Sequence, residues 1–352
     1  MKPPVRVGII GYGYATKTFH APLVACVPGL ALTAVSSSDP AKVRSDWPGV
    51  EVVATPQALI ARDDIDLVIV PTPNDTHHPI AHAALSAGKH VVVDKPFTLT
   101  RAEAHGLTAL ARQRGRVLSV FHNRRWDGDF LSVRELLAGG QLGRVTHVES
   151  HFDRFRPAVR GRWREQPGAG SGLWFDLGPH LLDQTLQLFG RPQALAVDLM
   201  TQRDGAVTDD AFHAQLRYAD GLRVVLHASA LAAAPGARFT IHGTRGSYVK
   251  TGLDPQEDLL KAGHRPDGAS PWPLPVEAAT LIAQDPQAPD LVHGSSHPVL
   301  PGRYSAYYER LLDAIEGRGA NPVPAEEAAD VVALLELGCA SHRERGELPV
   351  PA

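Results

Sequence analysis

Short apolar runs alternate with helical patterns through residues 5–121. Five of these runs are brief and rich in β-branched residues, as buried strands are, and they cover Val5–Ile10, Leu30–Val35, Ile65–Val70, His90–Asp94 and Val117–Phe121. Helical spacing covers the segments Tyr14–Val27, Ala58–Arg62, Pro79–Ala87 and Thr100–Arg114. Strands and helices that alternate in this way predict right-handed βαβ units and a doubly wound parallel sheet.

The pattern changes after Phe121. Helical spacing covers Phe130–Ala138 and Phe175–Phe189, and strand-like runs cover Thr146–Phe155, Ala194–Thr201, Phe212–Tyr218, Leu222–Ser229 and Phe239–Ile241. Residues 263–302 are rich in Pro and Gly and predict a long irregular segment, followed by helices at Tyr304–Glu316 and Ala325–His342. We therefore expect an α/β protein with a first domain at residues 1–122 and a second, largely antiparallel α+β domain at residues 123–352.

A glycine-rich turn joins the first predicted strand to the first predicted helix. Its residues are Gly11, Tyr12, Gly13, Tyr14 and Ala15, followed by Thr16, where a dinucleotide-binding fingerprint usually has Gly or Ala. The first glycine permits the tight turn, and the second lets a pyrophosphate approach the backbone. The start of the helix offers N–H groups to the phosphates. In this position the motif predicts a dinucleotide site, although the same residues also suit an ordinary tight turn.

The end of the second predicted strand bears on the choice of cofactor. It reads Ser36, Ser37 and Ser38, and the first acidic residue after it is Asp39. Enzymes that use NAD usually place an acid here to hold the ribose 2′-hydroxyl, and that acid would repel a 2′-phosphate. Serine hydroxyls, with Lys42 one turn further on, suit the phosphate. We therefore favour NADP, with NAD possible; the alternative is that the serines cap a helix that begins near Asp39.

Two later strand ends also face the crevice where ligands bind in such sheets. The first carries Thr72, Pro73 and Asn74, with His77 shortly after, and its prolines stiffen a loop expected to lie along the cofactor. The second carries Lys95, which follows Asp94 and precedes Pro96. A lysine in this position is expected where nicotinamide and substrate meet.

Asp176 and His180 lie four residues apart in a predicted helix, so they share one helix face. The simplest interpretation is the solvated side of an amphipathic helix. A shared metal ion is a second possibility, but no third protein ligand is evident nearby. His77, His78 and His82 form another possible metal cluster, which fits a helix start beside the cofactor loop better. No metal site is therefore predicted.

The composition limits the class of protein. The chain has 352 residues, with 35 Lys and Arg against 38 Asp and Glu, for a net charge of −3. This near-balance argues against a dedicated nucleic-acid binder, which carries a basic surplus. Two cysteines, Cys26 and Cys339, exclude a disulfide scaffold or a four-cysteine zinc site. With no signal peptide or apolar run long enough to cross a membrane, we expect a cytoplasmic protein without membrane contact.

Taken together, these motifs resemble the Gfo/Idh/MocA family of NAD(P)-dependent oxidoreductases over essentially the whole chain. The resemblance rests on the glycine turn with residues 17–22, on Thr72-Pro73-Asn74, on Asp94-Lys95-Pro96 and on Asp176-Leu177-Gly178-Pro179-His180. The family more often has Glu at the position of Asp94. Residues 121–127 and 150–157 resemble a subgroup that includes NADP-dependent scyllo-inositol dehydrogenases.

The resemblance implies a Rossmann domain followed by an open-sheet α+β domain whose exposed face joins subunits, as a homodimer or homotetramer. It implies that Lys95, Asp176 and His180 form a catalytic trio for reversible oxidation of a cyclic polyol or sugar. A base with the pKa range of histidine suits proton exchange with a hydroxyl near neutral pH. Asn123, Arg124, Trp163 and Tyr308 are weaker candidates for the substrate pocket. Another sugar, aldose or diketone reductase of the family is the nearest alternative, and a ligand-sensing regulator is a non-enzymatic one.

Overall fold

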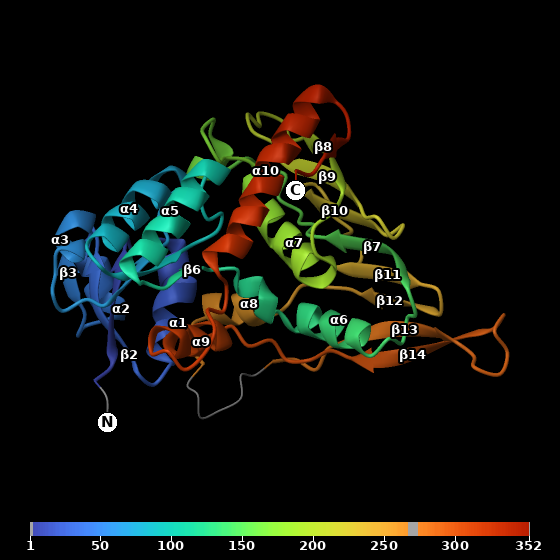
Figure 1. Cartoon of the computed structure of the whole chain (residues 1–352), viewed down its shortest axis with the longest axis horizontal. Coiled ribbons are helices and arrows are strands. Elements are labelled where there is room, and N and C mark those ends of the chain that lie inside the picture. Colours follow the sequence, from blue (N-terminus) through green and yellow to red (C-terminus); the bar gives the residue numbers. More distant parts are fainter. Residues whose placement is uncertain (1–2, 267–273, 352) are drawn as a thin grey trace. The chain divides into compact units, whose positions relative to one another are not determined.

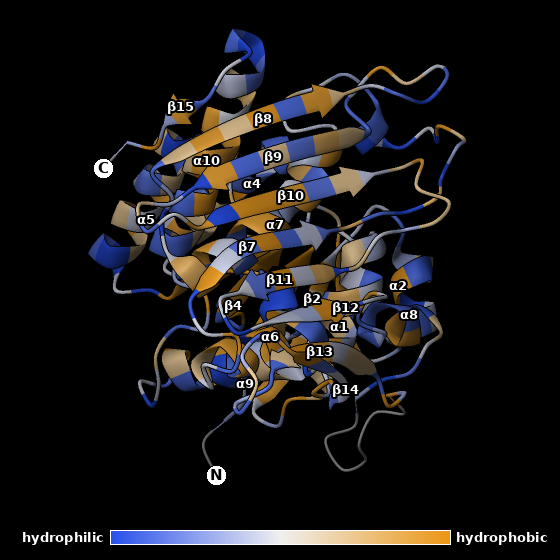
Figure 2. Cartoon of the chain, turned by 90° about the vertical axis from the view of Figure 1, so that its right-hand side faces the viewer, coloured by the Kyte–Doolittle hydropathy of each residue, from blue (hydrophilic) through white to orange (hydrophobic). Residues whose placement is uncertain are grey.

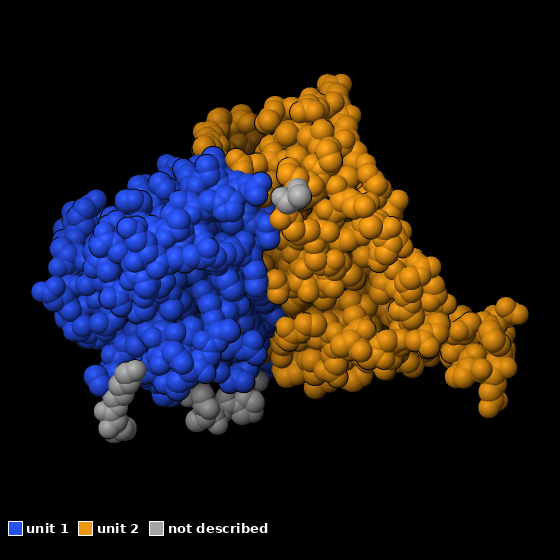
Figure 3. All heavy atoms as spheres, viewed as in Figure 1, with its two compact units in different colours: residues 1–126, 255–274, 303–332 blue, residues 127–254, 275–302, 333–352 orange. Residues whose placement is uncertain are grey.

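The computed structural model describes residues 3–266 and 274–351. The chain divides into two compact units, which are interleaved along the sequence (Figure 3). Unit 1 comprises residues 1–126, 255–274 and 303–332, and unit 2 comprises residues 127–254, 275–302 and 333–352. The sequence divides less simply than the expected 1–122 and 123–352, because residues 255–274 and 303–332 return to the first unit.

Unit 1 is built on a six-stranded parallel sheet in the order β3-β2-β1-β4-β5-β6 (Figure 1). The strands are β1 (Val5–Ile10), β2 (Leu30–Ser36), β3 (Glu51–Val53), β4 (Leu67–Val70), β5 (His90–Val93) and β6 (Leu118–Val120). The doubly wound parallel sheet predicted from the sequence is confirmed. The apolar runs of β4 and β5 are buried at almost every residue, which explains why they do not alternate with polar residues.

Helices cover this sheet and complete its core. They are α1 (Ala21–Ala25), α2 (Pro40–Asp46), α3 (Pro56–Ile60), α4 (Asn74–Ser86), α5 (Arg101–Arg114), α8 (Gln256–Lys261) and α9 (Ser305–Ile315). Helix α5 begins with a capping box: the Thr100 hydroxyl accepts from the Glu103 N–H, and the Glu103 carboxylate accepts from the Thr100 N–H. Tyr307, Tyr308 and Leu311 of α9 join the same buried core.

Unit 2 is built on a nine-stranded sheet in the order β14-β13-β12-β11-β7-β10-β9-β8-β15 (Figure 2). Its strands are β7 (Val145–His151), β8 (Ala194–Met200), β9 (Ala211–Arg217), β10 (Arg223–Ser229), β11 (Phe239–Gly243), β12 (Gly246–Lys250), β13 (Ala278–Gln284), β14 (Val292–Pro298) and β15 (Leu348–Pro349). Strands β7 and β10 are parallel, and the other neighbouring pairs are antiparallel. The sheet is therefore mixed and mostly antiparallel, as predicted.

One face of this sheet packs against helices, and Figure 2 shows the other face open. The helices are α6 (Gly128–Ala138), α7 (Leu173–Phe189) and the end of α10 (Ala325–Glu344), whose residues from 333 onward belong to unit 2. In β9, Phe212, Ala214 and Leu216 are buried, whereas His213 and Gln215 between them are exposed. This alternation places the apolar side chains toward α7, where Trp174 meets Phe212 edge to face.

The prediction of a long irregular segment at residues 263–302 is wrong for much of its length. Strands β13 and β14 pair from Ala278 with Pro298 to Gln284 with Val292 and extend the large sheet at its edge. Strand β14 reads Val-His-Gly-Ser-Ser-His-Pro and is exposed at nearly every position, so it carries no hydrophobic alternation that would reveal it. Residues 267–273 of the segment lie outside the described residues.

Candidate functional site

The turn after β1 has the geometry that the glycine motif predicts. Gly11 has φ +86°, a left-handed conformation that favours glycine. A Cβ placed on Gly13 would meet nothing within 4 Å, so the backbone there faces open space that a pyrophosphate group suits. The departure at Thr16 also has a structural reason: its buried hydroxyl donates to the Gly11 carbonyl at 2.8 Å and closes the turn. The residues therefore fit a dinucleotide.

The two tyrosines of this turn are held by protein carboxylates. Tyr12 is buried, and its hydroxyl donates to Asp46 at 2.8 Å, while Lys17 lies 2.9 Å from the same carboxylate. Tyr14 is exposed and donates to Glu257 at 2.9 Å. Partial desolvation of its hydroxyl, followed by the nearby Glu257, raises the pKa of Tyr14 to about 12, so this phenol stays protonated. Because both tyrosine hydroxyls are bonded to carboxylates, the turn offers a ligand mainly its backbone groups, including those of Ala15.

The serines at the end of β2 have separate environments. Ser36 is buried, and the Ser37 hydroxyl accepts from the Asp39 N–H at 3.1 Å, whereas Ser38 is exposed. Asp39 caps α2, since its carboxylate accepts from the Lys42 N–H at 3.1 Å. The serines themselves do not cap α2, as the alternative expected; the cap is Asp39, whose own N–H donates to the Ser37 hydroxyl. The carboxylate of Asp39 is engaged with the helix, and the side chain of Lys42 is exposed in its first turn.

The ends of β4 and β5 lie side by side, because these strands are parallel neighbours. Thr72 and Pro73 follow β4, and Asn74 begins α4. His77 on α4 is buried, with Nδ1 2.8 Å from the Pro96 carbonyl and Nε2 2.9 Å from the Thr72 carbonyl. Both ring nitrogens are thus occupied by the protein. The ring therefore joins the two loops, and its contact with the cofactor stays a prediction.

Lys95 follows β5 in a loop whose backbone is held by the side chain of Asp94. The Lys95 N–H donates to the Asp94 carboxylate at 2.7 Å. The other oxygen of Asp94 lies 3.6 Å from Nε2 of the buried His20, whose Nδ1 is 2.5 Å from the Tyr308 hydroxyl. Burial opposes ionisation of Asp94, but His20 and Lys95 favour the charged form and hold its pKa at about 2. His20 had no predicted role of its own, although it lies within residues 17–22 of the family motif.

Unit 2 holds its candidate residues on α7, whose start is fixed from outside the helix. Gly172 has φ +89°, and a Cβ there would collide with Asp209, whose carboxylate accepts from the Trp174 N–H at 2.6 Å. Burial raises the pKa of Asp209 to about 6. Trp174 then fills the space beside Gly178 and Gly338, where a Cβ would approach its ring to 3.0 and 2.5 Å. These contacts set the rotation of α7.

Asp176 and His180 project from one side of α7, as their spacing predicts. Asp176 is half-buried, and its carboxylate lies 3.5 Å from Nε of Arg164. His180 is buried, with 6% of its surface exposed. The structure thus brings these two together in unit 2, and it brings the glycine turn, residues 36–38, residues 72–74 and Lys95 to one edge of the sheet in unit 1.

The four weaker candidates differ in their surroundings. Arg124 is buried and pairs with Glu257 at 2.7 Å, and Asn123 beside it is also buried. Tyr308 is fully buried with its hydroxyl on His20, so the expected pocket-lining role is corrected to support of Asp94 from the core. Trp163 is exposed and carries the Arg164 guanidinium 4.7 Å above its ring.

Two other kinds of site are absent from the described residues. Within residues 3–266 and 274–351, no three His, Cys, Asp or Glu side chains are grouped to hold a metal ion. In the same ranges, no helix combines the length and apolar character needed to span a membrane.

Comparisons with known proteins agree with this arrangement. Residues 5–122 match the NAD-binding Rossmann fold of an oxidoreductase family, and residues 134–351 match the C-terminal alpha/beta domain of the same family. The chain belongs to the Gfo/Idh/MocA oxidoreductase family. It is an NAD(P)-dependent oxidoreductase, and the expectation drawn from its motifs is confirmed.

Individual relatives cover nearly the whole chain. The uncharacterized oxidoreductase YdgJ of Escherichia coli is 54% identical and covers 99% of each chain. The scyllo-inositol 2-dehydrogenase (NADP(+)) IolW of Bacillus subtilis is 37% identical over 97% of this chain and 94% of its own. The solved structure of YPO2259 from Yersinia pestis superposes with a TM-score of 0.94 at 52% identity, covering 100% of this chain and 99% of that one.

Proposed function

We propose that this protein transfers hydride reversibly between NADP and a secondary alcohol of a cyclic polyol or sugar, with scyllo-inositol as the first candidate substrate. The similarity to the NADP-dependent scyllo-inositol 2-dehydrogenase IolW over almost the whole chain carries the proposal. The paired Asp176 and His180 on α7 and the secured Lys95 loop support it. Unit 1 would hold the nucleotide, and unit 2 would hold the substrate.

Each member of the trio has a role suited to its chemistry. When bound, the nicotinamide supplies the hydride acceptor at C4. His180 takes the proton of the reacting hydroxyl, a role that suits an imidazole near neutral pH. Lys95 donates to the same oxygen and stabilises the negative charge that develops on it. Asp176 accepts from a neighbouring hydroxyl of the substrate and fixes its orientation.

The preference for NADP is supported by the end of β2. Asp39 is turned toward the N-terminus of α2, so its carboxylate caps the helix. The exposed Ser38 and Lys42 offer a hydroxyl and a cation suited to a 2′-phosphate. Backbone N–H groups of the glycine turn and the start of η1 (Thr16–His20) would hold the pyrophosphate.

A reductase acting on another sugar, an aldose or a diketone is the second candidate. A relative named dTDP-3,4-didehydro-2,6-dideoxy-alpha-D-glucose 3-reductase is 35% identical over 57% of this chain, which favours this possibility. A ligand-sensing regulator would have no need of the trio, and Lys95, Asp176 and His180 are all present.

A substrate panel tests the proposal directly. The purified protein is incubated with scyllo-inositol, myo-inositol, aldoses and their keto forms, with each coenzyme, and absorbance is followed at the reduced nicotinamide band. We expect turnover of a cyclic polyol or sugar with a higher kcat/KM for NADP than for NAD. Absence of any coenzyme-dependent absorbance change across the panel in both directions contradicts the proposal.

We also propose that the protein works in the cytoplasm as a homodimer or homotetramer joined through the open face of the large sheet. That face carries exposed polar residues such as His213 and Gln215 of β9 and lies free of helices in Figure 2. Light scattering after size-exclusion chromatography gives the mass in solution. We expect Gln215→Lys to lower that mass by placing a charge on each facing sheet, and a monomeric wild type contradicts the proposal.

A further inference from the structure

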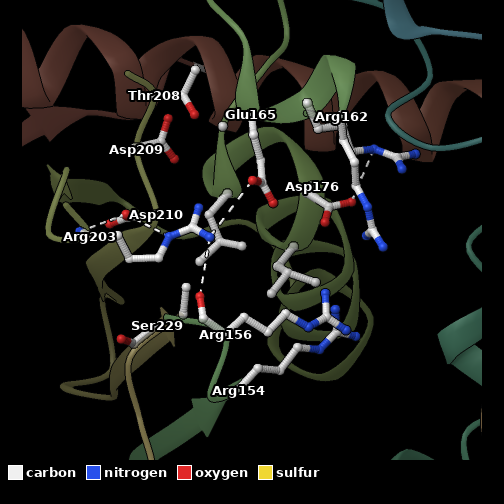
Figure 4. A pocket seen from close by; sticks show the side chains of 15 residues that line it. Arg154, Arg156, Arg162, Glu165, Asp176, Arg203, Thr208, Asp209, Asp210 and Ser229 are labelled. Carbon is white, nitrogen blue, oxygen red and sulfur yellow. Dashed lines mark hydrogen bonds and ion pairs between the residues drawn. The ribbon is translucent and has the colours of Figure 1, made fainter. Parts of the chain in front are cut away.

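A cavity in unit 2 is lined by five arginines (Figure 4). They are Arg154 and Arg156 after β7, Arg162 and Arg164 in the following loop, and Arg203 between β8 and β9. The cavity holds about 600 Å³ of space, part of which is open solvent, and the first turn of α7 with Asp176 forms another part of its wall. It therefore adjoins one member of the proposed catalytic trio.

Two of these arginines are neutralised by acids in the same wall. Arg203 is buried, with its Nε 3.0 Å from Asp210 and a terminal nitrogen 3.8 Å from Glu165. Arg164 lies 3.5 Å from Asp176. Arg203 and Arg164 therefore have ion-pair partners within the protein and stabilise the wall of the cavity.

The acids of the wall have further partners of their own. Asp210 accepts from the N–H groups of Gln202 and Arg203, and Glu165 accepts from the N–H of Arg160. Asp209 caps α7. These carboxylates therefore already accept hydrogen bonds from the backbone.

Arg156 and Arg162 are different. Among residues 3–266 and 274–351, neither guanidinium has a hydrogen-bonding or ion-pairing partner. Arg154 lies over the ring of Phe152 at 4.7 Å, and Figure 4 shows Arg154 and Arg156 among the side chains that line the cavity. Like charges that line one cavity repel, so an anion among them is favourable.

The arginines near the cavity are concentrated in one short stretch of the sequence. Residues 154–164 contain five arginines, although the chain as a whole has a net charge of −3. The positive end of α7 points into the same wall and adds to the field. A general basic surface therefore does not explain the cluster.

We infer that the arginine cavity binds an oxyanion carried by the substrate, so that the alcohol oxidised is an anionic sugar or polyol bearing a carboxylate or a phosphate. This inference rests on the proposed function and narrows its substrate class, because it replaces the neutral scyllo-inositol as first candidate with a charged polyol or sugar. Guanidinium groups bind both oxyanions through paired N–H donors, which hydroxyl groups of a neutral polyol do not match. Arg156 and Arg162 are the groups that recognise the anion.

The test compares charged and neutral substrates of the same skeleton. Glucuronate and glucose 6-phosphate are set against glucose, and an inositol monophosphate against myo-inositol, for the wild type and for Arg156→Ala and Arg162→Ala. Arg160→Ala is the matched control, because Arg160 lies in the same loop but does not line the cavity. Calorimetry with inorganic phosphate on the NADP-loaded protein measures anion binding without turnover.

We expect kcat/KM of the wild type to be at least about tenfold higher for a charged compound than for its neutral counterpart. Arg156→Ala and Arg162→Ala should remove this preference mainly through KM, whereas Arg160→Ala should keep it. A preference for glucuronate identifies a sugar acid, and a preference for either phosphate identifies a phosphorylated substrate. Equal kcat/KM for charged and neutral compounds overturns the inference while the proposed function stands.

The calorimetric arm separates the two proposals when no compound is turned over. Phosphate binding that is lost in Arg156→Ala and Arg162→Ala and kept in Arg160→Ala supports the anion site even then. In that case only the proposed reaction fails. Absence of phosphate binding by the wild type, together with no charge preference, rejects the anion site.

Discussion

Nε2 of His20 lies 3.6 Å from the Asp94 carboxylate, directly behind the loop that presents Lys95. The other oxygen of Asp94 accepts from the Lys95 N–H, and the Tyr308 hydroxyl lies 2.5 Å from the opposite side of the His20 ring. Burial raises the pKa of Tyr308 well above its ordinary value, so its hydroxyl keeps a proton to donate to His20. A chain of buried polar contacts therefore links α9 to the backbone of the proposed catalytic lysine.

Tyr308→Phe tests this linkage. Removal of the hydroxyl leaves His20 Nδ1 without that partner and loosens its hold on Asp94, so we expect a loss of about 1–3 kcal/mol in the free energy of unfolding. We also expect a lower kcat with little change in KM for coenzyme, measured by steady-state kinetics.

Tyr307→Phe is the control, because the Tyr307 hydroxyl donates to Ser119 at 2.9 Å in the same buried core. It should reduce stability by a comparable amount while kcat stays near that of the wild type. Equal kcat in the two variants would show that the Tyr308 contact is only structural.

Asp209 predicts a specific dependence of stability on pH. Its pKa is raised to about 6 in the folded protein by burial, against 3.8 in an unfolded chain. The folded state therefore binds the extra proton more tightly, and this contribution is complete below about pH 4 and is lost as pH rises through 6. Asp209→Asn keeps an oxygen acceptor for the Trp174 N–H and removes the titration.

Unfolding in denaturant at a series of pH values measures this effect. From pH 4 to pH 7 the wild type should lose about 2–3 kcal/mol of unfolding free energy relative to Asp209→Asn. A difference that stays constant over this range is incompatible with the raised pKa.

A buried ion pair in unit 2 provides a test of stability. Nε of Arg238 lies 3.4 Å from Asp129, and its terminal nitrogens donate to Ser150 at 2.6 Å and to Gln184 at 2.5 Å. Arg238→Met leaves Asp129 as a buried charge and should cost about 3–5 kcal/mol in chemical denaturation.

The exposed pair of Arg217 and Glu347 is the control, and Arg217→Met should cost no more than about 1 kcal/mol. The double variant Arg238→Met with Asp129→Leu should be more stable than Arg238→Met alone, because the uncompensated carboxylate is gone. A double variant that is less stable than this single variant contradicts the explanation.

Lys42 tests the preference for NADP. Lys42→Ala removes the exposed cation expected beside the 2′-phosphate, so kcat/KM for NADP should fall about tenfold while that for NAD stays nearly constant. Lys89→Ala serves as a control outside this strand end, since its ammonium donates to the carbonyls of Arg62 and Ile65. Equal losses with NADP and NAD would assign Lys42 to another role.

The sequence predicted those elements whose side chains respond to burial. The apolar runs of β4 and β5 and the helical spacing of α5 are local signals, and each appears in the structure where expected. The hairpin of β13 and β14 was missed because Val292–Pro298 is exposed at nearly every position and pairs mainly through backbone atoms. Such an edge leaves no periodic pattern in the side chains.

The same distinction holds for the candidate site. The spacing of Asp176 and His180 sufficed to place them on one side of α7, because helix geometry is local. The buried roles of His77 and Tyr308 depend on partners 19 and 288 residues away, at Pro96 and His20, and no short motif reveals such contacts. Whether an arginine of the cavity has a partner likewise depends on distant residues. The carboxylates of Asp210 and Glu165 pair with Arg203 and, within the described part of the chain, leave Arg156 and Arg162 without an acidic partner.

Lys95→Met tests the central claim most directly, because it removes the ammonium and retains an unbranched side chain. Dinucleotide binding is measured by fluorescence titration, and hydride transfer by the change in nicotinamide absorbance with the best polyol or sugar substrate. We predict that binding persists within about threefold and that kcat falls by at least about a thousandfold, in the range found when one electrostatic donor is removed. Hydride transfer at the rate of the wild type would contradict the assignment of Lys95 and, with it, the proposed catalytic trio.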